Sequence, residues 1–358
     1  MYNLMELLNT VASKRASDLH IVVGLPPMMR LDTVVRPIGK EKLTAEDTKQ
    51  LIYSVLDERQ IKMFEEKCEL DASFPIENKE NSGRVRLNIF RQQGYISAAL
   101  RFIPQKTYTF EELHLSKVVY EIVNLQKGLV LVTGATGSGK TTTLASMINY
   151  INERRRGHII TIEDPIEYLH PHKNCIVNQR EIGSDTATFS DALKYVLRQD
   201  PDVILVGEMR DLETIAAAMT LAETGHLVFA TLHTMDAASS VNRIVDAFPG
   251  NQQAQIRSQL SLTLKAVFSQ QLLPHASGHG MALASEIMIV NDSIKNIIRE
   301  MKTEQLYSII QTNRQNGMQT MNQSLFDNVI TGSVLPQVAL EYSSRKEELI
   351  RLLQGTIR

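Results

Sequence analysis

Two different spacings of hydrophobic residues divide the chain into two regions. In the segment RVRLNIF (84–90), apolar and polar residues alternate, which predicts a strand with one buried and one polar face. The segment YISAALRF (95–102) alternates in the same way, and the intervening QQG predicts a turn, so the two should form a hairpin. From about residue 116 onward, short apolar runs alternate with longer segments of helical periodicity. That pattern is typical of a parallel sheet covered by helices.

The residues before the hairpin predict a small α/β domain. Leucine and valine residues recur at helical spacing near the N-terminus, which predicts an amphipathic helix there. Strands are expected at LHIVVG (19–24) and within LPPMMRLD (25–32). Residues 44–67 are expected to be helical, with Thr44 as the N-cap.

These elements predict an α/β fold with two domains. The N-terminal α/β domain should cover residues 1–103, followed by a linker over 104–115 and a second domain over 116–358. The last hundred residues or so are predicted to be mainly helical. Helices are expected there at SLTLKAVFSQQLL (261–273) and in the tail EYSSRKEELIRLLQG (341–355).

Composition narrows the class of protein. Of the 358 residues, 43% are hydrophobic and 22% are charged, which is ordinary for a soluble globular protein. The net charge of −2 differs from the basic balance of proteins that bind nucleic acid by neutralising phosphates, so no nucleic-acid partner is predicted. No apolar run reaches the ~20 residues of a membrane helix, and the N-terminus lacks the pattern of a signal peptide, which predicts a cytoplasmic location. The two cysteines, Cys68 and Cys175, form no CxxC pair, so a structural zinc site is not expected.

The segment GATGSGKTTT (134–143) matches G-x-x-x-x-G-K-[ST] and lies between a predicted strand and a predicted helix. In such a loop, glycines let backbone N–H groups turn inward around phosphate oxygens. Lys140 should contact the β- and γ-phosphates of ATP, and the Thr141 hydroxyl should ligate Mg²⁺. The predicted nucleotide-binding residues are Gly134, Thr136, Gly137, Ser138, Gly139, Lys140, Thr141 and Thr142. The alternative is a glycine-rich turn that binds nothing.

Acidic residues follow two further predicted strands. Glu208 ends VILVGE (203–208), where a P-loop protein places the acid that orders Mg²⁺; the alternative is a salt bridge to Arg210 alone. Glu163 ends the strand in HIITIEDPIEY, at the edge of the sheet that faces ligands in open α/β folds. We expect Glu163 to orient and deprotonate the attacking water, because Asp164 is held in the turn before a proline. A solvated acidic loop is the alternative.

Two histidines and two arginines are further candidates. His226 and His233 lie at the two ends of a predicted strand, where one can face the γ-phosphate and the other a domain or subunit contact. A structural role is the alternative for each. Arg86 and Arg101 lie on the polar faces of the hairpin and could supply charge to a phosphoryl-transfer transition state, or could simply be solvated.

Four segments together resemble the motifs of the secretion ATPases, which serve type II secretion, type IV secretion and type IV pili. They are GATGSGKTTT, TIEDPIEY, VILVGEMRD and LAETGHLVFATLHT. Other segments resemble the pilus retraction ATPases of the PilT family, such as RASDLHIVVGLPPMMRLD and FRQQGYISAALRFIP. SIKNIIRE (293–300) is similar to the AIRNLIRE segment of that family. The resemblance covers nearly the whole chain.

The resemblance implies a PAS-like N-terminal domain, a RecA-like P-loop ATPase domain and a homohexameric ring. It implies that the chain hydrolyses ATP, with Mg²⁺, to power type IV pilus retraction and twitching motility at the inner face of the cytoplasmic membrane. The implied partners are the inner-membrane pilus platform protein and other retraction and assembly ATPases of the pilus. The chain would associate with the membrane only by binding to these partners.

The resemblance also implies roles for individual residues. Glu163 corresponds to the general base, Glu208 to the acidic residue that acts through Mg²⁺, and His233 to the histidine that senses the γ-phosphate. Arg86 and Arg101 correspond to arginines that reach the nucleotide from the N-terminal domain.

The chain departs from the family pattern at a few positions, and two other functions stay open. Ser293 and Lys295 replace Ala and Arg, and His114 and Ser116 stand where relatives often carry Gly and Pro. None of these positions is expected to touch the nucleotide.

A pilus assembly or type II secretion ATPase is one alternative, but such relatives usually carry an extra N-terminal domain and a four-cysteine zinc module. A RecA-type nucleic-acid translocase is the other and predicts a basic channel.

Overall fold

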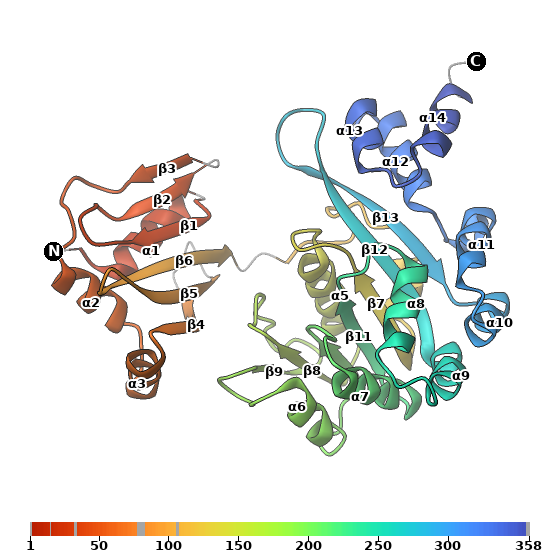
Figure 1. The fold of residues 1–358 in the computed structure, drawn as a ribbon, viewed down its shortest axis with the longest axis horizontal. Helices are drawn as coiled ribbons and strands as arrows, with labels where there is room; N and C mark the ends of the chain where they lie inside the picture. Colours follow the sequence, from red (N-terminus) through yellow and green to blue (C-terminus); the bar gives the residue numbers. More distant parts are fainter. Residues whose placement is uncertain (1, 15, 32–33, 77–82, 105–106, 356–358) are drawn as a thin grey trace. The chain divides into compact units, whose positions relative to one another are not determined.

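The computed structural model describes residues 2–14, 16–31, 34–76, 83–104 and 107–355, which form two compact units (Figure 1). The first unit comprises Met1–Lys106 and the short segment Pro165–Leu169; the second comprises Thr107–Asp164 and His170–Arg358. Both contain strands and helices, so the predicted α/β class is confirmed.

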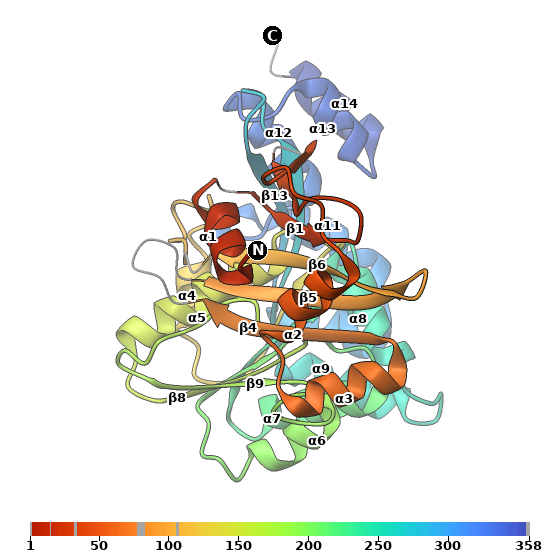
Figure 2. The same cartoon turned by 90° about the vertical axis from the view of Figure 1, so that its left-hand side faces the viewer.

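In its described residues, the first unit is an antiparallel sheet of six strands with three helices packed on it. The strand order is β3-β2-β1-β6-β5-β4, with β1 Asp18–Ile21, β2 Met28–Leu31, β3 Val34–Pro37, β4 Glu69–Ile76, β5 Gly83–Gln92 and β6 Tyr95–Pro104. The helices are α1 Leu4–Ser13, α2 Ala45–Tyr53 and α3 Glu58–Lys67 (Figure 2). The predicted hairpin is present as β5 and β6, joined at Gln93 and Gly94, and its apolar face packs under the helices.

The helical prediction for residues 44–67 is confirmed over Ala45–Tyr53 and Glu58–Lys67, but the helix is interrupted between them. Thr44 caps α2 as expected, but α2 ends at Tyr53 and a second helix begins after Asp57. Asp57 is extended, and its carboxylate accepts a hydrogen bond from the backbone N–H of Gln60, whose side chain binds back to the Asp57 N–H. This capping box starts a new helix and thereby breaks the apolar stripe that reads as continuous in sequence.

The second unit contains a seven-stranded sheet in the order β13-β12-β7-β11-β10-β8-β9. All neighbours are parallel except β12 and β13. The strands are β7 Gly128–Thr133, β8 His158–Glu163, β9 Ile176–Glu181, β10 Val203–Val206, β11 Leu227–Leu232, β12 Leu264–Pro274 and β13 Met281–Ile289. The helices are α4 Val119–Val123, α5 Lys140–Arg154, α6 Phe189–Val196, α7 Leu212–Glu223, α8 Ala237–Asp246, α9 Gln253–Thr263, α10 Asp292–Glu300, α11 Leu306–Thr312, α12 Met321–Ile330, α13 Pro336–Tyr342 and α14 Lys346–Gly355.

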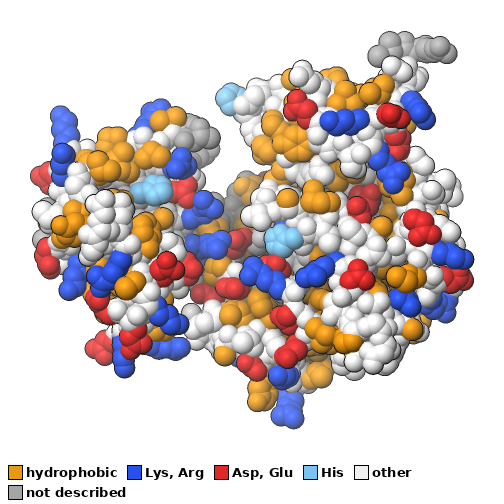
Figure 3. Space-filling model, viewed as in Figure 1, with side chains coloured by type: hydrophobic (Ala, Val, Ile, Leu, Met, Phe, Trp, Pro, Cys, Tyr) orange, Lys and Arg blue, Asp and Glu red, His pale blue; other side chains and the backbone are white. Residues whose placement is uncertain are grey.

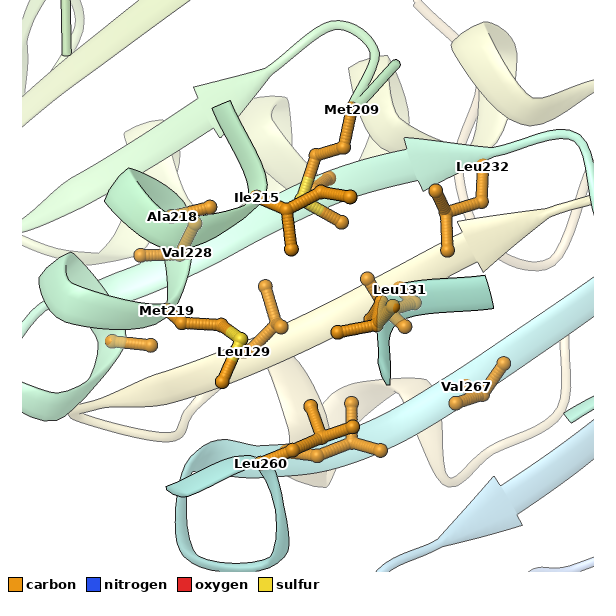
Figure 4. Close-up of a cluster of buried hydrophobic side chains, with 14 of the residues drawn as sticks. Leu129, Leu131, Met209, Ile215, Ala218, Met219, Val228, Leu232, Leu260 and Val267 are labelled. Atoms are coloured by element: carbon orange, nitrogen blue, oxygen red, sulfur yellow. The ribbon is translucent and has the colours of Figure 1, made fainter. Parts of the chain in front are cut away.

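Both faces of this sheet are buried, which explains the continuous apolar runs of its strands. Leu129 and Leu131 of β7 pack with α7 and α9 on one face (Figure 4), whereas Val130 and Val132 pack with α4 and α5 on the other. On the surface, acidic and basic side chains are interspersed over the face that Figure 3 shows.

The prediction of a helix over 261–273 was wrong. Helix α9 ends at Thr263, and Leu264–Pro274 is the strand β12, which pairs with β7 and β13. Because β12 lies between two strands and is covered on both faces, its residues show no alternation of apolar and polar positions. Periodicity therefore cannot distinguish this strand from a helix. Beyond Asn291 the described chain is helical, as predicted, although a turn at Ser343–Arg345 divides the tail.

His114 occupies a position that favours glycine. Its φ is 52°, in the left-handed region, and its side chain is exposed. A residue other than glycine in this conformation lowers the stability of the folded state by about 1–2 kcal/mol. Substitution by glycine would remove this cost, but the greater flexibility of glycine in the unfolded chain would cancel part of the gain. We expect His114→Gly to increase the free energy of unfolding by up to about 1 kcal/mol in a denaturant titration. His114→Ala, which keeps a Cβ, should give no such gain; an equal gain in both variants would contradict this account.

Candidate nucleotide-binding and catalytic site

The loop between β7 and α5 has the backbone of a phosphate cradle. Gly134, Gly137 and Gly139 have φ values of 138°, 80° and 89°, which side chains other than glycine rarely adopt. A Cβ on Gly134 would lie 2.4 Å from the Gln270 carbonyl oxygen, whereas a Cβ on Gly137 would meet nothing within 4 Å. The loop is thus packed at its base and open at its tip, with the N-terminus of α5 behind it.

Side chains of the loop are poised for a polar ligand. Lys140 Nζ donates to the carbonyl oxygens of Gly134 (2.8 Å) and Ala135 (2.9 Å), so its ammonium group lies over the loop itself. Ser138 Oγ is buried and has no hydrogen-bond partner among the described residues. Burying a hydroxyl without a partner is unfavourable. A phosphate in the cradle would accept from both groups, so this loop fits a nucleotide.

Glu163 is the last residue of β8 and is only 6% exposed. Its Oε1 accepts hydrogen bonds from Thr161 Oγ1 (2.6 Å) and from Gln179 Nε2 (3.2 Å). Asp164, the next residue, is exposed. A carboxylate held by two donors is fixed in orientation, which is a property that a general base needs.

Glu208 lies two residues beyond β10 rather than at its end. Gly207 N still donates to Ile162 O of β8, but Met209 N donates to Thr231 O of β11, so the chain turns at Glu208 from one neighbouring strand to the other. The Glu208 carboxylate accepts from Arg210 Nη2 (2.7 Å) and lies 3.0 Å from His233 Nε2. The salt bridge to Arg210 therefore exists, but it is only one of two contacts.

The electrostatic surroundings keep Glu208 ionised. Burial acts to raise the pKa of Glu208, but the hydrogen bond and the charge of Arg210 and the contact with His233 outweigh it, so the pKa lies below its ordinary value. A carboxylate that stays ionised at neutral pH can interact with a cation or with a water molecule bound to one.

The strand order brings these groups to one edge of the sheet. Strands β7, β11, β10 and β8 are successive neighbours and run parallel, so their carboxyl ends lie side by side. The P-loop follows β7, His233 follows β11, Glu208 follows β10, and Glu163 ends β8. His226, by contrast, lies at the opposite end of β11, where Nδ1 is 3.0 Å from the Leu221 carbonyl oxygen. This contact caps the preceding helix and gives His226 a structural role.

Arg86 and Arg101 belong to the first unit and lie directly opposite each other on β5 and β6. Arg86 Nη1 donates to Glu167 Oε1 (3.0 Å), and Arg101 Nε donates to Asp18 Oδ1 (2.9 Å). The two arginines are thus cross-strand neighbours, and the guanidinium group of each is paired with a carboxylate.

Two residues of the site escaped the sequence analysis. Thr161 is a buried hydroxyl in an otherwise apolar strand, two residues before Glu163 and therefore on the same face, a spacing that could have identified it. Gln179 could not be found in this way, because its contact with Glu163 depends on the pairing of β8 with β9.

Known proteins of one family are similar to this chain over nearly its full length. The model of a family described as type II/IV secretion system protein matches residues 2–280. The type IV pilus retraction ATPase PilT of Pseudomonas aeruginosa is 49% identical over 339 residues, which cover 95% of this chain and 97% of that protein. The twitching motility protein of Neisseria gonorrhoeae is 44% identical over 348 residues, or 97% and 92% of the two chains. A crystal structure of the pilus retraction motor PilT with bound ADP has a TM-score of 0.91 at 47% identity and covers 98% of this chain and 100% of its own.

Proposed function

The chain belongs to the type II/IV secretion system protein family of ATPases, and from this premise we propose that it is a motor that hydrolyses ATP to power type IV pilus retraction. The observation that carries the proposal is the similarity to a retraction ATPase over 95% of this chain and 97% of that relative. The arrangement of the P-loop, Glu163, Glu208 and His233 on adjacent strand ends supports hydrolysis as the reaction.

We propose that the P-loop residues named above bind the triphosphate of ATP. Lys140 would exchange its contacts with the loop carbonyls for the β- and γ-phosphates. Thr141 and Glu208 are the residues that would hold Mg²⁺, Glu208 partly through water, and a bound Mg²⁺ neutralises charge on the phosphate oxygens.

The remaining residues act on the water and on the developing charge. Glu163 accepts the proton of the attacking water, and positioning this water next to the phosphate supplies much of the acceleration. His233, which contacts Glu208, registers whether the γ-phosphate is present. Arg86 and Arg101 stabilise the charge of the transition state when they leave their carboxylate partners.

Work on a pilus requires an assembly at the membrane. We propose a homohexamer in the cytoplasm that acts on the inner-membrane platform protein of the pilus and works beside other pilus ATPases. Within the described part of the chain, no helix has the length and apolar character to cross a membrane. Light scattering with nucleotide present should give the mass of six chains; a monomer under all conditions would contradict the ring.

The cellular test is to image surface pili on cells that lack the gene and carry the wild type or Lys140→Ala on a plasmid. We expect excess pili and lost twitching in the deletion, restored by the wild type and not by Lys140→Ala. Bald cells would mean that the motor drives assembly, and unchanged piliation would overturn a role as the main retraction motor.

Arg86→Ala and Arg101→Ala are each expected to lower ATP hydrolysis by the assembled ring about tenfold or more, since an arginine at a phosphoryl-transfer site contributes strongly to the rate. Steady-state phosphate release measures the effect. Arg84→Ala is the matched control, because Arg84 lies on the same face of β5 but donates to Ser73 Oγ. Equal rates of hydrolysis in all three variants would mean that Arg86 and Arg101 are surface residues without a role in the reaction. The stability of the Arg101→Ala variant should also be measured by thermal unfolding, because this substitution removes a partner of Asp18.

A further inference from the structure

Gln179 connects the candidate base to the backbone of the following loop. Its Oε1 accepts a hydrogen bond from the backbone N–H of His170 (2.7 Å), and its Nε2 donates to Glu163 Oε1 (3.2 Å). A backbone N–H can only donate, so it fixes which end of the amide is the acceptor. The NH₂ end must then face Glu163, and Gln179 presents a donor to that carboxylate.

The strand register makes this contact specific. Thr161 and Gln179 are direct partners in the β8–β9 ladder, and both donate to the same oxygen of Glu163. Two donors on one oxygen restrict rotation of the carboxylate about its last bond. A near-attack geometry depends on such restriction, because small displacements of a base from its proton are costly.

The charges around Glu163 explain why a neutral donor is useful there. Glu181 lies opposite Glu163 in the same ladder and is also buried, at 5% exposure. Asp164 follows Glu163 in the chain, and Glu208, whose carboxylate is paired with Arg210, follows the neighbouring strand β10. Neighbouring carboxylates disfavour the ionised form, whereas hydrogen bonds donated to a carboxylate favour it.

We propose that Gln179 is a positioning residue for ATP hydrolysis, which orients Glu163 and holds it in the ionised form that accepts a proton. This inference rests on the proposed function of Glu163. The competing explanation is that Gln179 only anchors the backbone at His170.

Two variants separate these explanations. Gln179→Glu keeps an acceptor for the His170 N–H but replaces the donor to Glu163 with a negative oxygen. Gln179→Met has a similar size and removes both hydrogen bonds. An anchor tolerates the first variant better than the second, whereas a positioning residue tolerates neither.

The test is the pH profile of ATP hydrolysis by the full-length protein, with thermal unfolding and binding of an ATP analogue as checks on folding. For Gln179→Glu we expect kcat at pH 7 to fall about tenfold to a hundredfold, the acid limb of the kcat profile to move up by about one pH unit, and KM for ATP to stay within about twofold. For Gln179→Met we expect a similar loss of kcat. Wild-type kcat and pH profile in Gln179→Glu, or loss of nucleotide binding in both variants, would overturn the proposal in favour of an anchor.

A double variant distinguishes failure of this inference from failure of the proposed function. Adding Gln179→Glu to Glu163→Gln should change the residual rate by less than about twofold, because the group that Gln179 positions is already disabled. If the losses of rate in the two single variants multiplied in the double variant, Gln179 would act on a group other than Glu163. Full activity of Glu163→Gln alone would instead remove Glu163 from its role, and the proposal for Gln179 with it.

Discussion

Glu163→Gln is expected to keep ATP binding and to lower the rate of hydrolysis by a factor on the order of a hundred or more. The amide has the size of the carboxylate but cannot accept the proton of the attacking water. The P-loop follows a different strand, β7, and the substitution leaves its backbone unchanged, so the affinity for ATP should be preserved. Phosphate release and the binding of a fluorescent ATP analogue measure the two properties separately.

Asp164→Asn is the matched control for this variant. Asp164 is the adjacent acid, but it is exposed, whereas Glu163 is buried and held by two donors. We expect Asp164→Asn to hydrolyse ATP within a few-fold of the wild type. If the two variants exchanged these outcomes, Asp164 would be the base; near-normal hydrolysis in both would exclude a base at the end of β8.

Gly134→Ala is expected to abolish productive nucleotide binding, with a loss of affinity of about a hundredfold or more. Gly134 has a φ of 138°, which costs a residue with a Cβ on the order of 1–3 kcal/mol. The new methyl group would also lie 2.4 Å from Gln270 O and 2.6 Å from Ser138 Oγ. The Gln270 oxygen belongs to β12, which is paired on both sides and cannot withdraw, so the loop must move instead. Titration with a nucleotide analogue measures the loss.

Gly137→Ala tests whether space or conformation dominates in this loop. Gly137 also has a positive φ, but a Cβ there would meet nothing within 4 Å. Only the conformational cost of about 1–2 kcal/mol remains, so the affinity should fall by about fivefold to thirtyfold. A Gly137→Ala variant that binds as poorly as Gly134→Ala would show that packing against β12 does not determine the shape of the loop.

Local patterns in the sequence predicted several elements correctly, and the causes of two errors are clear. The hairpin of β5 and β6, the strand before the P-loop and the strand that ends at Glu163 follow from alternation or from short apolar runs with flanking turns. The break between α2 and α3 was missed because apolar residues continue along the chain up to Asp57, the capping residue at which the second helix begins. Strand β12 was missed because burial on both faces removes periodicity.

The nature of the chemistry follows from residue types and their spacing along the chain. The P-loop motif, the acids at the ends of apolar strands and the resemblance to secretion ATPases depend only on residue types at fixed spacings, since a loop of given composition cradles phosphate through its own backbone. Which of these groups meet depends on how the strands are arranged in the folded chain. In the chain, the P-loop is followed by Glu163, Glu208 and then His233, but the crossover order of the sheet places His233 nearest the P-loop strand and Glu163 farthest away. The Glu208–His233 contact joins residues that follow two different strands, and the hydrogen bond from Gln179 to Glu163 joins residues of two different strands. Such contacts depend on strand order and register, which arise from the packing of the whole sheet and leave no local trace in the sequence.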